Sequence, residues 1–394
     1  MRALNLDDAV VETAVSGLDE PWAFEFIGDN QVLITETRGR MLRVPLDGRP
    51  PKPIDGLPEI ATEREQTGLL DVELHPGFHV NRRIYFSYVA PDETGRYYAT
   101  AVDTAILEDD RLSRRRTLLR VEPFAWSPSN FGGVMEFDPE GYLYVSVGDR
   151  SEPATAQMGD RLQGKILRLN DDGSVPADNP FVHDPAIDDR IWALGVRNPQ
   201  GLHYDGPSGF IFEAEHGPMG GDEINIIRRG ANYGWPTISY GRNYTAEALG
   251  FAPDQHSPQL DFHLSTDPGF EIGARTERIG MEQPLFYYLP STAISPLTVV
   301  RGPMFPEWEG HILVGALKGR HVSKIDYDGR DVRSEVRILT EFRGRIRDLN
   351  VAEDGSIWIL VQSGELYRLF RDPDLLPLQR AVARAEDFAL AAER

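Results

Sequence analysis

One sequence pattern recurs six times along the chain and limits the folds that it can adopt. An alternating apolar run is followed by a polar turn with Asp and Gly, a second apolar run and a short return segment. Examples are "WAFEFIGDNQVLITETRGRMLRVPLDG" (22–48), "GVMEFDPEGYLYVSVGDR" (133–150) and "RDLNVAEDGSIWILVQSGELYRLF" (347–370). Alternation with a period of two, bounded by such turns, predicts antiparallel hairpins. Each unit is therefore expected to be a small sheet that cannot bury both of its faces alone.

Sheets of this kind can bury their faces by stacking radially around an axis. The pattern thus predicts an all-β fold, a six-bladed β-propeller with four-stranded antiparallel blades. The alternative is a pair of β-sandwiches, but the pattern is evenly distributed and no Pro/Gly/Ser-rich linker divides the chain. A closed ring also accommodates 394 residues, which are too many for one ordinary core. We expect a single propeller over residues 1–372.

Two segments fall outside the repeated pattern. Residues 231–296 are rich in Tyr, Pro and Gly and predict a long loop excursion over one face of the ring. Binding groups often sit on such loops when a rigid scaffold carries them. Residues 373–394 have a helical composition and predict a C-terminal helical tail with no chemical role.

The composition excludes several classes of function. A formal net charge of −21 argues against a nucleic-acid partner, because phosphate groups would be repelled by most of the surface. The absence of cysteine rules out disulfides, thiolate metal sites and a thiol nucleophile. The sequence shows no apolar run long enough for a membrane span or a signal peptide. A soluble protein with a small-molecule ligand is the remaining expectation.

Positively charged side chains are predicted to converge near one end of the ring. Lys318 lies where an apolar run ends in a turn, and Arg345 and Arg347 open the next unit. Residues i and i+2 of a strand point to the same side, so these two arginines share a face. Together with Arg197, they form a candidate cationic cluster that suits a polycarboxylate or phosphate ligand. The alternative is that each cation forms an ordinary ion pair with one of the 62 acidic residues.

A second candidate site lies in "EHGPMGGDEINIIRRGANYGWP" (215–236). Main-chain carbonyls of the Gly-Pro turn, the carboxylates of Asp222 and Glu223 and the carbonyl of Tyr233 are hard oxygen ligands, which Ca²⁺ prefers. The segment does not match an EF-hand loop.

The search for acid and base groups leaves mainly carboxylates. His75 is interpreted as a strand cap, His203 as facing either the ring centre or the blade packing, and His216 as a hydrogen-bonding scaffold residue. No Ser/His/Asp arrangement, phosphate-binding loop or metalloprotease motif is present. Asp149, at the end of an apolar run, is the leading candidate.

Several motifs, in order, resemble the soluble pyrroloquinoline quinone (PQQ) dependent aldose sugar dehydrogenase family, which is related to soluble quinoprotein glucose dehydrogenase. The similarity runs from about residue 17 to residue 370. It rests on "LDEPWAFEF", "QTGLLDVELHPGF", "NFGGVMEFDPEGYLYVSVGDR", "GKILRLNDDGSVPADNPF", "IWALGVRNPQGLHYD", "EHGPMGGDEINIIRRGANYGWPTISYG", "ALKG" and "RIRDL". The resemblance implies a six-bladed propeller that holds PQQ over its central tunnel with a Ca²⁺ ion.

The resemblance also assigns roles to individual positions. Those that match the family's cofactor contacts are Gln66, Arg197, Asn198, Tyr244, Lys318, Arg345 and Arg347. The carbonyls of Gly217 and Pro218 match ligands of a catalytic Ca²⁺, whereas Glu223 and Tyr233 match a second, structural calcium site. Because PQQ is a tricarboxylate, it would explain the predicted cationic cluster.

The chain departs from the family where the chemistry needs a base. The family places a His immediately before "FGGR", and this sequence has Asn130 there, with Val134 in place of the Arg. An amide can orient a hydroxyl but has no lone pair that titrates near neutral pH. The catalytic candidates are therefore Asn130, Asp149 and Arg197, with Asp149 or a calcium-bound water as the replacement base.

Three functions are compatible with this departure. The chain can be a PQQ- and calcium-dependent oxidoreductase of altered or reduced activity on a sugar or alcohol, which passes electrons to an acceptor of unknown identity. It can bind a ligand without turnover, or it can be a re-purposed lyase, isomerase or hydrolase. The resemblance implies a periplasmic or secreted location and leaves the oligomeric state open.

Overall fold

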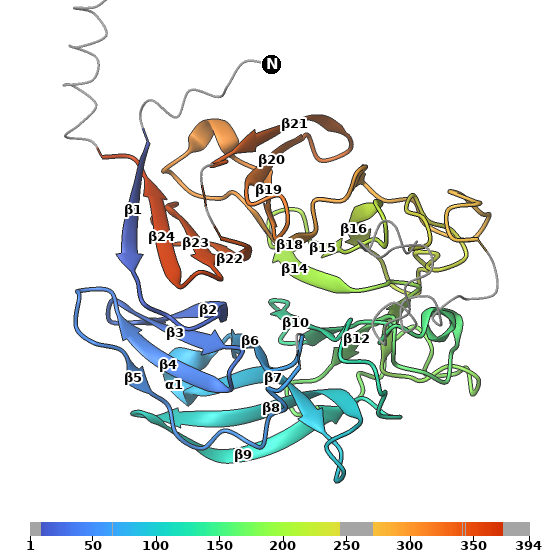
Figure 1. Cartoon of the computed structure of the whole chain (residues 1–394), viewed down its shortest axis with the longest axis horizontal. Coiled ribbons are helices and arrows are strands. Elements are labelled where there is room, and N and C mark those ends of the chain that lie inside the picture. The colour runs from blue at the N-terminus through green and yellow to red at the C-terminus, as the bar shows by residue number, and fades with distance from the viewer. Residues whose placement is uncertain (1–8, 65, 245–270, 341, 343, 373–394) are drawn as a thin grey trace, which may run out of the picture.

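The computed structural model describes residues 9–64, 66–244, 271–340, 342 and 344–372. Six four-stranded antiparallel sheets are arranged in a ring, which confirms the predicted six-bladed β-propeller (Figure 1).

The first three blades follow one another directly along the chain. The first contains β2 (Pro21–Gly28), β3 (Gln31–Glu36), β4 (Arg40–Pro45) and β5 (Lys52–Pro53). The second contains β6 (Leu69–Leu74), β7 (Arg83–Pro91), β8 (Tyr98–Glu108) and β9 (Arg111–Arg120), with the short helix α1 (Phe78–Asn81) between its first two strands. The third contains β10 (Gly132–Phe137), β11 (Leu143–Val147), β12 (Lys165–Leu169) and β13 (Ile191–Leu194), with the 3₁₀ turn η1 (Pro153–Gln157) after β11.

The other three blades complete the ring and bring the two ends of the chain together. The fourth contains β14 (Pro199–Asp205), β15 (Phe210–Glu215), β16 (Asp222–Ile227) and β17 (Phe286–Tyr288). The fifth contains β18 (Ile294–Val299), β19 (Ile312–Ala316), β20 (Val322–Tyr327) and β21 (Val332–Ile338), with the 3₁₀ turn η2 (Pro306–Trp308). The sixth contains β22 (Ile346–Val351), β23 (Ile357–Val361), β24 (Glu365–Phe370) and, as its outermost strand, β1 (Val10–Val15).

The N-terminal strand closes the ring. Strand β1 pairs antiparallel with β24, so that Val10 lies opposite Phe370, and Figure 1 shows the blue and red strands side by side. The sixth blade therefore combines strands from both ends of the chain. The sixth blade also packs against the first, where Phe24 shares a core cluster with Leu360.

The alternating pattern of the strands builds the core between neighbouring blades. On β3, Val32 and Ile34 pack with Trp358 of the sixth blade, whereas Leu33, on the opposite face, packs with Leu69 of the second. One strand thus fills two interfaces because its successive side chains point to opposite faces.

The Asp-x-x-Gly turns have the predicted role in the hairpins. In the third blade, the Asp138 carboxylate accepts the N–H of Tyr142 at 2.8 Å, and the carbonyl of Asp138 accepts the N–H of Gly141 at 3.0 Å. Gly141 has a φ of 86°, a conformation that other residues adopt only at a cost. The turn residues therefore explain why β10 and β11 pair at this point.

The segments that fell outside the repeat are only partly described. The expected excursion over residues 231–296 includes the short strand β17 and the first residues of β18. The expected helical tail at residues 373–394 lies outside the described residues. Within the described part of the chain, no helix is long and apolar enough to cross a membrane.

Candidate functional site

A cavity of about 740 Å³ lies where the segments between the blades meet. Gln66, Asn130, Arg197 and Ala293 each stand shortly before the innermost strand of a blade, so closure of the ring gathers them at one end. A second cavity of about 220 Å³ adjoins the first and shares Gln66, His216 and Ala293 with it.

The structure places the predicted site residues on these cavities or on a small void of about 10 Å³ beside them, with the exception of Asp222. The Asp222 carboxylate instead accepts the N–H of Gly217 at 3.1 Å and the hydroxyl of Ser291 at 2.8 Å. The larger cavity is lined by Gln66, Asn130, Asp149, Arg197, Gly217, Pro218, Tyr244 and Lys318, among others. The second is lined by Gln66, Asn198, Arg345 and Arg347, and the void by Arg197, Gly217, Glu223 and Tyr233. The residues are thus brought together, and their individual roles stay predictions.

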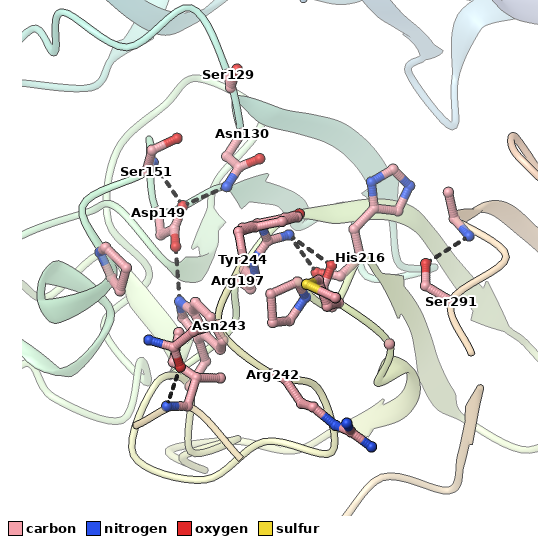
Figure 2. A pocket seen from close by; sticks show the side chains of 18 of the residues that line it. Ser129, Asn130, Asp149, Ser151, Arg197, His216, Arg242, Asn243, Tyr244 and Ser291 are labelled. Carbon is pink, nitrogen blue, oxygen red and sulfur yellow. Dashed lines mark hydrogen bonds between the residues drawn. The ribbon is translucent and has the colours of Figure 1, made fainter. Parts of the chain in front are cut away.

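Asn130 is held in the wall of the larger cavity (Figure 2). Its side-chain Nδ2 donates to Oδ1 of Asp149 at 2.9 Å, and its main-chain N–H donates to Oε1 of Gln66 at 3.1 Å. Its φ of 55° is left-handed, a region in which Asn and His are tolerated better than most residues. Since the amide nitrogen faces Asp149, the amide oxygen is the acceptor that Asn130 can offer to a ligand.

Asp149 is fixed by three donors. Oδ1 accepts the Asn130 amide and the N–H of Ser151 at 2.8 Å, and Oδ2 accepts the indole N–H of Trp235 at 2.8 Å. Both carboxylate oxygens are therefore already hydrogen-bonded within the protein. The arrangement orients the Asn130 amide, because Asp149 cannot rotate without losing these bonds.

Arg197 links the cavity wall to the Gly-Pro turn. Its guanidinium donates to the carbonyls of His216 at 2.9 Å and Gly217 at 3.1 Å, and to the hydroxyl of Tyr244 at 3.4 Å. The Glu215 carboxylate accepts the main-chain N–H groups of Arg197 and Asn198, which holds this turn in place. Burial raises the pKa of Glu215 to about 7.

Three cations of the site do not form the ion pairs that were the alternative reading of the sequence. Arg197, Lys318 and Arg347 have no carboxylate within 4.0 Å among the described residues. The Nε of Arg347 is shielded from solvent and lacks a hydrogen-bond partner in the described structure, while its Nη2 donates to Gln362 at 2.9 Å. Burial, and then repulsion by Arg345, lowers the pKa of Arg347 to about 9.

The pKa of His216 is affected by the positive charges of the site. Burial and the charges of three nearby arginines lower its pKa to about 3. These are Arg197, Arg345 and Arg347. The side chain is therefore neutral at physiological pH, and its Nε2 is shielded from solvent without a hydrogen-bond partner in the described part of the chain. Arg197 at the start of the fourth blade and Arg345 and Arg347 at the start of the sixth thus act on one point, as the predicted cationic cluster requires.

A third cavity of about 60 Å³ on the ring axis is acidic. Its carboxylates come from the innermost strands of four blades and are Glu25, Asp71, Glu73, Glu136 and Asp348. Burial raises the pKa of Glu136 to about 8 and that of Asp348 to about 7. Arg347 and Val134 also line this cavity. The resembling family has an Arg at the position of Val134, and the valine adds no positive charge to the cavity.

Oxygen atoms gather at the predicted structural calcium site. Glu215 and Glu223 face each other across β15 and β16 and line the void of about 10 Å³ together with Tyr233. The next pair on the same face of the sheet, two residues along, is Glu213 and Asn225. Their Oε1 and Oδ1 atoms are buried and have no partner among the described residues. This all-oxygen donor set fits the chemistry of a hard cation. No group of three His, Asp or Glu side chains in the described chain is arranged to hold a metal alone, so main-chain and amide oxygens would have to complete the site.

At the predicted catalytic calcium site, fewer oxygen atoms are free to bind a cation. The carbonyl of Gly217 already accepts the Arg197 guanidinium at 3.1 Å. A carbonyl oxygen has two lone pairs, so a divalent ion would have to share this oxygen with Arg197.

Sequence reasoning missed two supports of the site and the acidic cavity. Trp235 and Glu215 hold Asp149 and the Arg197 turn, and both lie inside the motif of residues 215–236. The acidic cavity could have been found from carboxylates that recur in the first strand of several repeats.

Comparisons with known proteins agree with this architecture. A family model described as Glucose / Sorbosone dehydrogenase matches residues 18–368. Aldose sugar dehydrogenase YliI of Escherichia coli (strain K12) is 37% identical over 366 residues, which cover 91% of this chain and 92% of that protein. Quinoprotein glucose dehydrogenase B of Acinetobacter calcoaceticus is 33% identical over 265 residues, which cover 60% of this chain and 54% of that protein.

Solved structures show the same relationship. The soluble aldose sugar dehydrogenase of Escherichia coli in its apo form has a TM-score of 0.82 with this chain at 36% identity, and the match covers 92% of this chain and 100% of that one. The resemblance seen in the sequence motifs is confirmed, and the chain belongs to the Glucose / Sorbosone dehydrogenase family.

Proposed function

We propose that this protein is a PQQ- and calcium-dependent oxidoreductase that oxidises a hydroxyl group of a sugar or an alcohol, at a rate reduced by the amide at position 130. Family membership and the named activities of its relatives support a sugar substrate. The finer parts of the proposal, the cofactor and the metal, depend on the chemistry of the cavities.

The observation that carries the proposal is the concentration of cations without carboxylate partners. Arg197, Lys318 and Arg347 line two adjoining cavities of about 740 and 220 Å³ and have no salt bridge to a described residue. Clustered positive charges are costly unless an anion joins them, and arginines bind carboxylates with good geometry. A planar tricarboxylate such as PQQ supplies the negative charge that this site lacks.

Further side chains would hold the cofactor in the same cavities. Arg345 and the hydrogen-bonding groups of Gln66, Asn198 and Tyr244 line them, and each matches a cofactor contact of the resembling family. When bound, PQQ supplies the electrophilic quinone carbon that accepts a hydride. Arg197, which reaches the Gly217 carbonyl, is placed to polarise an oxygen at the cavity floor.

A calcium ion would be bound by oxygen ligands on the fourth blade. Gly217 and Pro218 supply main-chain carbonyls next to Arg197, and Glu223 and Tyr233 flank the smaller void. The buried oxygens of Glu213 and Asn225 without partners in the described chain support a cation near Glu223. A buried oxygen without a hydrogen-bond partner is costly, and a cation bound by both oxygens would remove that cost, which is the structural support for this part of the proposal.

Asn130 and Asp149 divide the task that a single histidine performs in the resembling family. The oxygen of the Asn130 amide accepts the hydrogen bond of the substrate hydroxyl and orients it. Asp149 is the carboxylate nearest to that amide and takes the proton, although both of its oxygens already accept hydrogen bonds from N–H donors. Loss of a well-placed general base costs about 10²- to 10⁴-fold in rate.

Ligand binding without turnover is the second candidate function. The hydrogen bond between Asn130 and Asp149 favours it, because Asn130 cannot act as a base and its amide occupies the Asp149 carboxylate. The cationic pocket would serve such a binding protein equally well.

Titration with PQQ in the presence of Ca²⁺, followed by dye reduction over a panel of aldoses and alcohols, tests the proposal. Saturable PQQ binding with turnover of at least one sugar supports it. Saturable binding without turnover favours the binding protein, and failure to bind PQQ favours a re-purposed site. A periplasmic or secreted location is part of the same proposal and is checked by fractionation of the source cells.

A further inference from the structure

Arg150 is a buried charge that lies outside all the cavities of the site. It has 1% of its surface exposed and is the largest fully buried side chain of the described chain. Burial lowers its pKa to about 9, so the guanidinium still carries its charge at neutral pH. No carboxylate of the described residues lies within salt-bridge distance of it. A buried charge without an ion pair must be stabilised by other contacts.

Most contacts of Arg150 lie around Asn130. Its Nε donates to the carbonyl of Ser129 at 3.0 Å, and its Nη2 donates to the carbonyl of Ser127. Its guanidinium lies over the ring of Phe131, with 3.6 Å between the guanidinium carbon and the ring centroid. Its main-chain N–H donates to the carbonyl of Asn130 at 3.2 Å. Arg150 therefore touches the residues on both sides of Asn130 and the main chain of Asn130 itself.

The same guanidinium ties this loop to the neighbouring blade. Its Nη1 donates to the carbonyl of Tyr98 on β8 at 2.9 Å, and Tyr98 exchanges main-chain hydrogen bonds with Ala125 at 2.8 and 3.0 Å. The planar fork of an arginine can bind several carbonyls in fixed directions, which a lysine cannot do. Movement of residues 125–131 would therefore break several bonds to one rigid group.

The backbone at this point needs such support. Asn130, Arg150 and Ser151 all have left-handed φ values, of 55°, 56° and 57°. Residues in this region carry a conformational cost unless their surroundings hold them. The hydrogen bond from the Asn130 amide to Asp149 joins these two strained turns.

We infer that Arg150 is a positioning residue for the reaction, which fixes the direction in which the Asn130 side chain faces the cavity. This inference rests on the proposed function for its kinetic readout. Arg150 lines neither of the two cavities of the site, so we place it outside contact with substrate and cofactor, and it acts through the main chain of residues 127–131.

A double-mutant cycle with the PQQ-loaded, Ca²⁺-containing protein tests this role. Arg150→Met is expected to lower kcat for sugar oxidation about 10- to 100-fold, because small displacements of an orienting group have effects of this size. Arg150→Lys should restore part of the loss. In an Asn130→Gly background, which accepts the left-handed backbone but has no amide, Arg150→Met should change kcat less than about twofold.

A matched control comes from the same blade. Arg168 is also buried and lies over the ring of Tyr142 at 3.6 Å, but it is bonded to Asp178 and Asn179 and lines none of these cavities. Arg168→Met should lower thermal stability and leave kcat unchanged. An equal loss of kcat from Arg150→Met in the native protein and in the Asn130→Gly variant would overturn the inference and leave Arg150 a purely structural residue.

A second readout does not depend on turnover. In protein labelled with ¹⁵N-asparagine and free of PQQ, the side-chain amide of Asn130 is identified by its loss in Asn130→Gly. Arg150→Lys should shift this resonance and speed its hydrogen exchange about tenfold or more, whereas Arg168→Met should not. An unchanged resonance in Arg150→Lys contradicts the inference. If the native protein oxidises no sugar, the proposed function fails, while the amide measurement still decides the role of Arg150.

Discussion

Replacement of Asn130 by histidine is expected to raise the rate of sugar oxidation by about 10²- to 10⁴-fold, the usual contribution of a general base. This corresponds to a lowering of the activation free energy by roughly 3 to 5 kcal/mol. The structure can accommodate the imidazole side chain at position 130. Asp149 is held by Ser151 and Trp235 and stays in place to bind one imidazole nitrogen, as it now binds the amide at 2.9 Å. The backbone φ of 55° is one that histidine tolerates.

The assay is steady-state dye reduction with PQQ, Ca²⁺ and an aldose, as a function of pH. Only a neutral imidazole accepts a proton, and Asp149 beside it favours the charged form and raises the imidazole pKa. The kcat/KM of Asn130→His should therefore rise with pH through that pKa. Asn130→Gln keeps an amide without a base and should give no gain. A rate for Asn130→His within about twofold of the native rate, at unchanged PQQ affinity, would show that substrate placement has diverged as well and would refute the reasoning.

Three further outcomes follow from the geometry. Arg347→Met should weaken PQQ binding about 10- to 100-fold in a fluorescence titration, because the loss of a charged hydrogen bond has an effect of this size. The control is Arg333→Met, which removes an exposed arginine paired with Asp328 and should have no effect. Chelation of Ca²⁺ should lower the melting temperature of the native protein, and Glu223→Gln should remove most of that response; equal responses of the two proteins would speak against a cation at this residue. Because the pKa of Asp348 is raised by burial from 3.8 to about 7, the folded state binds its proton more tightly than the unfolded state, so its contribution to stability is present in acid and is lost as pH rises towards 7. Denaturant unfolding between pH 5 and 7 should show a slope that Asp348→Asn reduces by up to about 1.4 kcal/mol per pH unit, and an identical slope in the variant would contradict the assignment.

The local parts of the fold could be read from the sequence because they depend on neighbouring residues. The Asp138 and Gly141 turn, for example, follows from the properties of these two residues, and the same turn repeated along the chain predicts the blades. The role of β1 could not be predicted in this way. Its partner β24 lies at the other end of the chain, and the six residues of β1 contain no pattern that identifies β24 as the partner.

The candidate site shows the same division. Arg345 and Arg347 line the same cavity, as alternation along the sequence predicted, and their convergence with Arg197 followed from the ring. The hydrogen bond between Asn130 and Asp149, and the support of Asp149 by Trp235, join residues up to 86 positions apart and depend on three-dimensional packing. The acidic cavity is different, because the carboxylates recur in the first strand of several repeats and the predicted ring brings Glu136 of the third blade and Asp348 of the sixth to its axis.

The pairing of β1 with β24 has a consequence for biosynthesis. A ribosome makes residues 10–15 before any blade exists, and their partner at residues 365–370 emerges only after almost all of the chain. During that interval the first segment is an unpaired edge that could pair with another molecule. We therefore expect β1 to dock only after β24 has been made, and a protein that lacks β1 should expose the edge of β24 and aggregate more readily.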